Sequence, residues 1–231
     1  MHTAVKFALV VVAATLAIAA RPANASTLLT VASYDMPNGN GTASGGGADY
    51  WDTAYSNCGV ANCTTDGAAL SGGKGLLTDG VIATESFGIG SGVGEYVGWL
   101  ADPTIIFHFG ATEGISELKL SVDNPSGVGG VGAPATVTIN GTAYSDPSWL
   151  TASGPETIDI TGLAITSSTI TLALTRSYPP NFWVFVSEAQ FFGPSPGATP
   201  LPAAWSMMLI GTAGLGIATW RRRKVAPVVS A

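Results

Sequence analysis

ISELKLSV, residues 115–122, is the stretch of this 231-residue sequence that decides its fold class. Apolar and polar residues alternate along it, with Leu118, Leu120 and Val122 on one side and Glu117, Lys119 and Ser121 on the other. Successive side chains of a β-strand point to opposite faces of a sheet. The alternation therefore predicts a strand with one face in a core and the other in solvent.

The same period of two recurs along the rest of the central region. Further strands are predicted at residues 28–34, 104–109, 136–139, 157–160 and 169–175. Turn sequences separate them, such as NPSG at 124–127 and NG at 140–141. No long amphipathic helix is predicted. Many short strands joined by such turns predict an all-β fold, an antiparallel β-sandwich or jelly roll.

The segment at residues 183–192 closes this region and is apolar on both sides. Strict alternation places Trp183, Phe185, Ala189 and Phe191 on one face, and Val184, Val186, Glu188 and Phe192 on the other. Such a strand is expected to be central and covered on both faces. Glu188 is then an anomaly, because a buried carboxylate needs a metal, an arginine or backbone N–H groups as partners.

The N-terminal residues have the features of a secretory signal peptide. Lys6 precedes fourteen mostly apolar residues, 7–20, and Ala23-Asn24-Ala25 forms a small-x-small cleavage pattern. We expect residues 1–25 to be removed by cleavage between Ala25 and Ser26. A membrane span is the alternative, but the run is short for one.

The C-terminal residues predict a single membrane-spanning helix. Residues 203–220 are uncharged, and eighteen residues at helical rise span about 27 Å, enough for a bilayer core. The basic cluster after them keeps its end in the cytoplasm; it is Arg221, Arg222, Arg223 and Lys224. The alternative, a buried helix of a soluble core, would rarely meet four consecutive cations.

These ends define the expected organisation. Residues 26–194 form the β-sandwich ectodomain, 195–202 a proline-rich linker, 203–220 the membrane helix and 221–231 a basic cytoplasmic tail. All fifteen carboxylates lie between Asp35 and Glu188, whereas residues 26–202 hold three cations, so the exported part has a formal charge of −12. Such a surface repels phosphates, which excludes nucleic-acid binding.

The tail resembles the PEP-CTERM sorting signal of bacterial envelope proteins. Pro200, Leu201 and Pro202 precede the apolar helix and the arginine-rich stop, in the order of that family. Leu201 stands where most members have Glu, as in the Val-Pro-Leu-Pro-Ala subgroup, with Thr199 here for Val. The resemblance implies processing by an exosortase, a membrane-embedded protease, and transfer of the ectodomain from an inner-membrane precursor to the cell surface or extracellular matrix.

Cys58 and Cys63 are the two cysteines of the chain. In an exported protein a lone, closely spaced pair predicts a disulfide. A metal site is the alternative, but two thiolates would need further Cys or His ligands nearby.

The sequence offers little catalytic chemistry. His108, the one histidine of the exported part, is flanked by Phe107 and Phe109, which predicts a structural role between core rings. No Gly-x-Ser-x-Gly motif supplies a nucleophile. We therefore expect a protein that is not an enzyme. Hydrolysis of a polysaccharide by a carboxylate pair remains an alternative.

Three segments resemble the galactose-binding-like jelly roll of discoidin and coagulation-factor type C domains. They are residues 77–80 with Trp99 downstream, residues 103–110, and residues 183–193. The resemblance implies that Asp79, in an Asp-Gly turn, and Glu188, in the last strand, lie near a structural calcium ion.

Two functions of different class follow. The first is carbohydrate binding in a matrix or at the cell surface, which requires aromatic rings to converge in one loop-formed cleft. The candidates for these rings are Trp99, Trp149, Tyr178 and Phe182. The second is a structural matrix or surface protein with no small ligand, in which these rings are buried.

Overall fold

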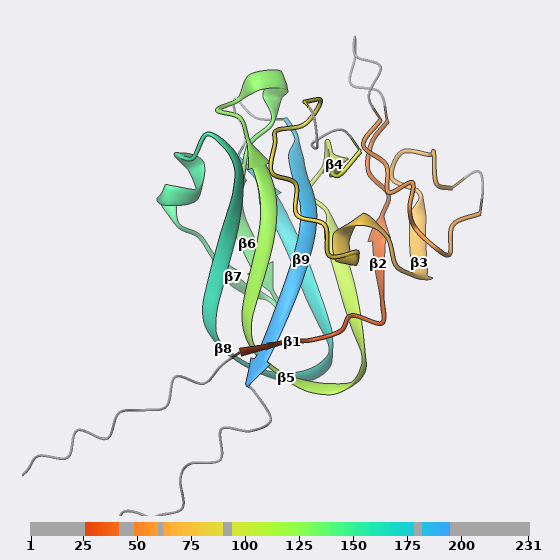
Figure 1. The fold of residues 1–231 in the computed structure, drawn as a ribbon, viewed down its shortest axis with the longest axis vertical. Coiled ribbons are helices and arrows are strands. Elements are labelled where there is room, and N and C mark those ends of the chain that lie inside the picture. The colour runs from red at the N-terminus through yellow and green to blue at the C-terminus, as the bar shows by residue number, and fades with distance from the viewer. Residues whose placement is uncertain (1–25, 42–48, 60–61, 90–93, 178–181, 195–231) are drawn as a thin grey trace, which may run out of the picture. The chain divides into compact units, whose positions relative to one another are not determined.

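The computed structural model describes residues 26–41, 49–59, 62–89, 94–177 and 182–194 (Figure 1). The expected signal peptide, linker, membrane helix and basic tail lie outside these residues, as does Tyr178. Within the described ranges, no helix is long and apolar enough to cross a membrane.

Nine strands and three short 3₁₀ helices make up the described part of the chain. The strands are β1 (Ser26–Leu28), β2 (Ser33–Pro37), β3 (Ala69–Gly73), β4 (Val97–Trp99), β5 (Thr104–Asn124), β6 (Pro134–Ile139), β7 (Thr142–Tyr144), β8 (Gly154–Arg176) and β9 (Val184–Pro194). The 3₁₀ helices are η1 (Leu76–Thr78), η3 (Val128–Gly130) and η4 (Pro147–Leu150). The pairs between these strands are antiparallel, which confirms the predicted all-β class.

Two long strands, β5 and β8, pair with each other and pass through both layers of the sandwich (Figure 1). The first part of β5 pairs with β2, and its last part pairs with β9. Register shifts between His108 and Glu113 and between Ile115 and Glu117 mark where β5 bends. The sequence predicted two strands in each of these regions, but the ladder continues through the bend.

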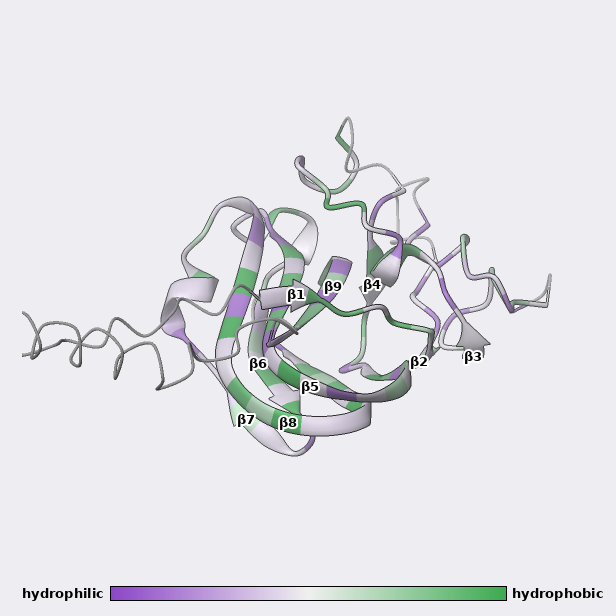
Figure 2. Cartoon of the chain, turned by 60° about the horizontal axis from the view of Figure 1, so that its bottom comes forward, coloured by the Kyte–Doolittle hydropathy of each residue, from purple (hydrophilic) through white to green (hydrophobic). Residues whose placement is uncertain are grey.

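The main core lies between the two layers. Leu118, Leu120 and Val122 are buried as the alternation predicted, and the rings of Phe107 and Phe191 pack across the layers with centroids 4.9 Å apart. Figure 2 shows the hydrophobic and hydrophilic residues alternating along the long strands. A second, aromatic cluster packs on the other face of β9; it contains Tyr50, Phe87, Tyr96, Trp183 and Phe185.

A β-bulge in β9 corrects the predicted faces of this strand. Ser121 pairs with Glu188 and Val122 pairs with Val186, so Ser187 is an extra residue. The bulge moves Val184 and Val186 to the main core, together with Ala189 and Phe191. Trp183 and Phe185 face the aromatic cluster instead. Glu188 therefore lies on the covered outer face, because an extra residue reverses the alternation.

The first predicted strand, residues 28–34, is divided between the two layers. β1 pairs with the end of β9, where Ser26 is opposite Pro194, whereas β2 pairs with β3 and with the start of β5. The chain crosses from one layer to the other between them, which breaks the ladder. β2 extends to Pro37, three residues beyond the predicted end of this strand.

Candidate functional site

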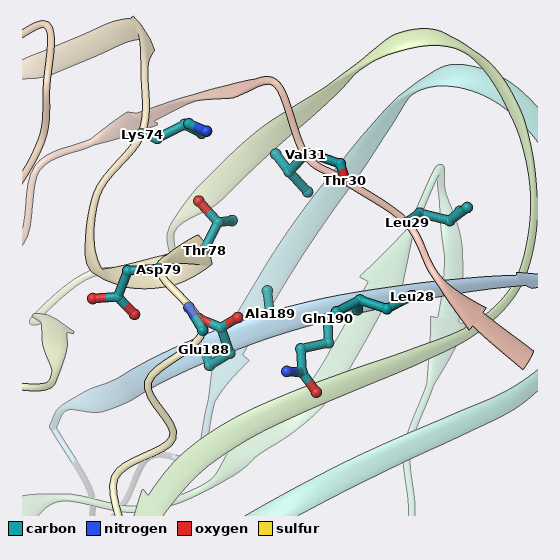
Figure 3. A pocket seen from close by; sticks show the side chains of 11 residues that line it. Leu28, Leu29, Thr30, Val31, Lys74, Thr78, Asp79, Glu188, Ala189 and Gln190 are labelled. Atoms are coloured by element: carbon teal, nitrogen blue, oxygen red, sulfur yellow. The ribbon is translucent and has the colours of Figure 1, made fainter.

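Glu188 and Asp79, which the resemblance placed near a calcium ion, both line one pocket. The pocket has a volume of about 210 Å³ and lies between η1, residues 28–31 and β9 (Figure 3). Glu188 is 4% exposed, and its Oε2 accepts a hydrogen bond from the Gly80 backbone N–H at 3.3 Å. Asp79 Oδ1 accepts from the Val81 N–H at 2.9 Å, which shapes the turn after η1.

The Glu188 carboxyl is in an environment that opposes its charge. Burial raises its pKa to about 8; the Gly80 N–H works against this rise, and the charge of Asp79 adds to it. The carboxyl therefore carries a proton at neutral pH in the absence of a cation. A ligand that prefers the carboxylate would have to displace this proton.

Thr78 adds a third oxygen to the same pocket. Its Oγ1 is buried and has no hydrogen-bond partner among the described residues. Leaving a buried hydroxyl without a hydrogen-bond partner costs about 1–3 kcal/mol of folding free energy. The Thr78 hydroxyl therefore favours a ligand that it can hydrogen-bond or coordinate. The described residues contain no cluster of three or more His, Cys, Asp or Glu. A cation here would therefore need Thr78 Oγ1 and backbone carbonyls beside the two carboxylates.

Asp52 is a buried residue beneath η1 that the sequence analysis missed. Its side chain accepts hydrogen bonds from the Tyr34 hydroxyl and from the Leu76 N–H, the latter at 3.1 Å. A Cβ on Gly75 would lie 2.2 Å from Asp52 Oδ1, so only glycine allows this approach. Burial raises the pKa of Asp52 despite these hydrogen bonds. The network fixes the start of η1 and with it the position of Asp79.

A second concave site, the Trp149 groove, lies beside η4. Its volume is about 430 Å³, and its lining is Ala143, Tyr144, Ser145, Asp146, Trp149, Asp159, Ile160 and Thr161. Asp146 caps η4 by accepting the Ser148 N–H at 2.8 Å, and Pro147 begins the helix. Asn124 donates to the Trp149 carbonyl at 2.9 Å and to Glu156 Oε1 at 3.3 Å, so it ties η4 to β8.

The Trp149 groove lies where the layers leave a side of the sandwich open. β7 pairs with β6, and residues 154–161 of β8 pair with β5; the β6 ladder reaches β8 at residues 172–176. The groove therefore has one wall on each layer. Tyr144 and Trp149 pack against the main core from this side while staying partly exposed.

Two of the other predicted rings, Trp99 and Phe182, do not join Trp149. Trp99 is 2% exposed, and its indole N–H donates to the Pro37 carbonyl at 2.8 Å, so it is a core residue. Phe182 is 50% exposed, but it lies beside Gly130 and does not line the Trp149 groove. The prediction that these rings converge in one cleft is therefore wrong for Trp99, since β4 turns its ring into the core.

His108 does not lie between the two phenylalanines that flank it in sequence. Alternation in β5 buries Phe107 and Phe109 and turns the imidazole to the outer face. His108 Nε2 lies 2.8 Å from Asp35 Oδ2, and the Ser71 hydroxyl donates to Asp35 Oδ1 at 2.7 Å. The group joins β2, β3 and β5. Because Ser71 faces Asp35, it is not positioned as a nucleophile activated by His108.

The predicted disulfide is confirmed. Cys58 and Cys63 are bonded, with their Cα atoms 5.5 Å apart. The bond closes a short loop whose neighbours are held by Asn38, which donates to the carbonyls of Asn62 and Cys63.

Comparison with protein-family models and with curated proteins gives no match. Among the solved structures that show partial similarity, three illustrate its extent. The family 32 carbohydrate-binding module of C. perfringens NanJ with galactose has a TM-score of 0.32 and 12% identity, over 51% of this chain and 82% of that one. The lectin domain of lectinolysin with Lewis B antigen has a TM-score of 0.37 and 13% identity, over 52% of this chain and 83% of that one. Chitosan-binding module 1 of a Paenibacillus sp. IK-5 chitosanase/glucanase has a TM-score of 0.30 and 17% identity, over 42% of this chain and 76% of that one. Overlap of this extent does not identify a ligand for the chain.

Proposed function

We propose that the chain is an exported protein that an exosortase-type protease releases from the inner membrane to the cell surface or to an extracellular polysaccharide matrix. The support is the signal peptide pattern, the Pro-Leu-Pro signature and the basic stop after residue 220. Ser26 lies opposite Pro194, so the two ends of the described domain lie side by side.

The sorting proposal is tested by the intact mass of the protein recovered from its host. We expect a mature form that begins at Ser26 and ends near Pro202. The control is a form with serine at Arg221, Arg222, Arg223 and Lys224, which should not be processed at the tail. A native protein that stays in the inner membrane and retains Trp220 would show that the tail is a plain anchor.

The ectodomain, in this proposal, binds a carbohydrate and does not turn it over. The observation that carries it is the Trp149 groove, where two partly exposed rings lie beside two carboxylates. Aromatic faces cover the apolar C–H faces of a sugar ring, and carboxylate oxygens accept its hydroxyl hydrogens. The groove has one wall on each layer and is open at the side of the sandwich, which suits a polymer rather than a small enclosed ligand.

Glycan-array binding of residues 26–196, with and without calcium, tests this function. These residues contain all the described strands and form one compact unit. We expect Trp149→Ala to abolish binding and Phe182→Ala, which removes an exposed ring outside the groove, to leave it unchanged. A folded fragment that binds no glycan, or binds equally well without Trp149, contradicts the proposal.

We also propose a structural calcium ion in the pocket of Asp79 and Glu188. Calcium takes six to eight oxygen ligands, so Thr78 Oγ1 and carbonyls of the η1 turn would complete the set. The buried carboxyl and the unpartnered hydroxyl are the observations that favour it. Its chemistry would be to neutralise Glu188 and to hold η1 against β9.

The second candidate function is a structural matrix or surface protein without a small ligand. It is favoured by the burial of Trp99 and by the packing of Trp149 against the main core. In that case Trp149→Ala lowers stability and changes no binding. Hydrolysis is a weaker alternative, because the His108 group is built for pairing between strands rather than for attack.

A further inference from the structure

The lining of the Trp149 groove is acidic. Asp146 on η4 and Asp159 on β8 contribute carboxylates, and the lining residues include no Lys, Arg or His. The two carboxylates come from the two walls of the groove, one on each layer. A bound sugar would therefore meet one carboxylate from each wall.

Both carboxylates are accessible to a ligand in the groove. Asp146 Oδ1 accepts the Ser148 N–H, and this hydrogen bond lowers the pKa of Asp146, so the group stays ionised in weak acid. In the part of the chain that the structure describes, no hydrogen bond or ion pair holds the Asp159 side chain. Asp159 is also solvent-exposed, so its carboxylate can contact a ligand.

The neighbouring charges do not neutralise this pair. Lys119 is opposite Asp159 in the β5–β8 ladder, but its Nζ lies 3.1 Å from Glu117 Oε1 and 5.2 Å from the centre of the Phe192 ring. The ammonium group is thus drawn toward β9 and away from the groove. Glu156 does not line the groove; its Oε1 accepts a hydrogen bond from Asn124, and burial raises its pKa.

We propose that the Trp149 groove selects a sugar polymer with free, protonated amino groups over the neutral, N-acetylated form of the same polymer. An ammonium group beside an indole or phenol face gains a cation–π interaction, and it pairs with the carboxylates. A neutral sugar gains hydrogen bonds but not these charge interactions. This inference rests on the proposed carbohydrate binding and names the class of sugar that the same site prefers.

Calorimetry with two tetrasaccharides tests the selection: one of glucosamine and one of N-acetylglucosamine, each titrated into residues 26–196. We expect tighter binding of the glucosamine form, with affinity that falls as salt rises. Affinity should also fall when pH drops far enough to protonate Asp146, whose pKa is lowered by its hydrogen bond from Ser148, and when pH rises through the pKa of the sugar amine. Trp149→Ala should weaken both ligands more than tenfold.

Asp159→Asn is the variant that reports the charge preference. We expect it to lower affinity for the glucosamine form by up to about fivefold, the upper end of the range for one exposed ion pair, and to leave the N-acetylated form unchanged. Asp49→Asn is the matched control, because Asp49 is exposed, carries the same charge and does not line the groove. It should change neither affinity.

The outcomes separate this inference from the proposed function. Equal or tighter binding of the N-acetylated form, still lost in Trp149→Ala, overturns the charge preference and leaves carbohydrate binding in place. An equal effect of Asp49→Asn and Asp159→Asn also overturns it, since the attraction would then come from net charge alone. Binding of neither tetrasaccharide, together with an array that shows no ligand, removes both.

Discussion

The Glu188 pocket and the Trp149 groove both place polar groups beside the β-sandwich core, but the pocket buries them and the groove exposes them to water. In the pocket, a carboxyl is 4% exposed under η1, and a hydroxyl lacks a partner. In the groove, the carboxylates face water while the rings pack on the core. Polar groups in the pocket therefore affect folding, whereas those in the groove affect binding with little cost to folding.

The largest expected effect is on the free energy of unfolding, and it separates Trp99, in the core, from Trp149, in the groove. Trp99→Ala should lower the free energy of unfolding by about 3–5 kcal/mol, because it removes a fully buried ring from the core. Trp149→Ala should cost less, since its ring is partly exposed. Urea unfolding measures both. Equal losses of unfolding free energy would mean that Trp149 is a core residue and does not serve as a ligand-binding surface.

The contrast also explains what the sequence could predict. Alternation fixed the faces of residues 115–122, because burial on one side leaves a pattern that any core must produce. Glu188 stood out for the same reason, as one carboxylate in an apolar strand. The bulge at Ser187 left no such mark, so the predicted faces of Trp183 and Phe185 were wrong.

Residues on loops were harder to place. Trp99 and Trp149 are both aromatic residues near turns, and composition alone does not distinguish a ring that β4 turns inward from one beside an open edge. Asp52 was missed because its role depends on Tyr34 and Leu76, which are brought to it by the fold. Contacts between distant segments leave no local period to read.

The next largest effect concerns calcium and pH at Glu188. Because the pKa of Glu188 is raised in the folded state, its protonated carboxyl contributes to folding stability below the ordinary pKa of about 4.3. Without calcium, this contribution is lost as pH rises through the folded-state pKa of about 8. Glu188→Gln removes this loss, so it should be more stable than the native protein at pH 9 and similar to it at pH 5. Thermal unfolding in a chelator measures this difference.

Calcium should reverse that order. A cation at about 100 times its Kd stabilises the native protein by about 2.7 kcal/mol and should have less effect on Glu188→Gln. Asp49→Asn, an exposed carboxylate outside the pocket, should respond to calcium as the native protein does. If neither calcium nor chelator moves the midpoint of either variant, the calcium proposal is wrong.

The disulfide is expected to contribute on the order of 2 kcal/mol, because it closes a short loop in the unfolded chain. Replacing both Cys58 and Cys63 by serine should lower stability by about this amount and leave glycan binding unchanged. Urea unfolding of the native and double-serine forms measures the difference. Loss of glycan binding at unchanged stability would instead place this loop in the ligand site.

The smallest effect is expected at the surface group of His108. Partial burial opposes the charge of Asp35, but hydrogen bonds from Ser71 and then His108 hold the pKa of Asp35 below its usual range. A lowered carboxyl pKa stabilises the fold above about pH 3.9, and this contribution is lost as pH falls through the folded-state pKa. His108→Ala should therefore cost at most about 1 kcal/mol at pH 7, because both side chains are about one-third exposed.

The pH dependence and a second variant distinguish this role from catalysis. The difference in unfolding free energy between the native protein and His108→Ala should shrink as pH falls and Asp35 becomes protonated. Ser71→Ala should show a similar, small loss, since it removes the other side-chain donor to Asp35. Hydrolysis of a polysaccharide that disappears in His108→Ala while stability is unchanged would make the outer face of β5 an active site. If both variants retain binding and neither shows hydrolysis, the role of His108 is structural: through Asp35 it links β5 to β2.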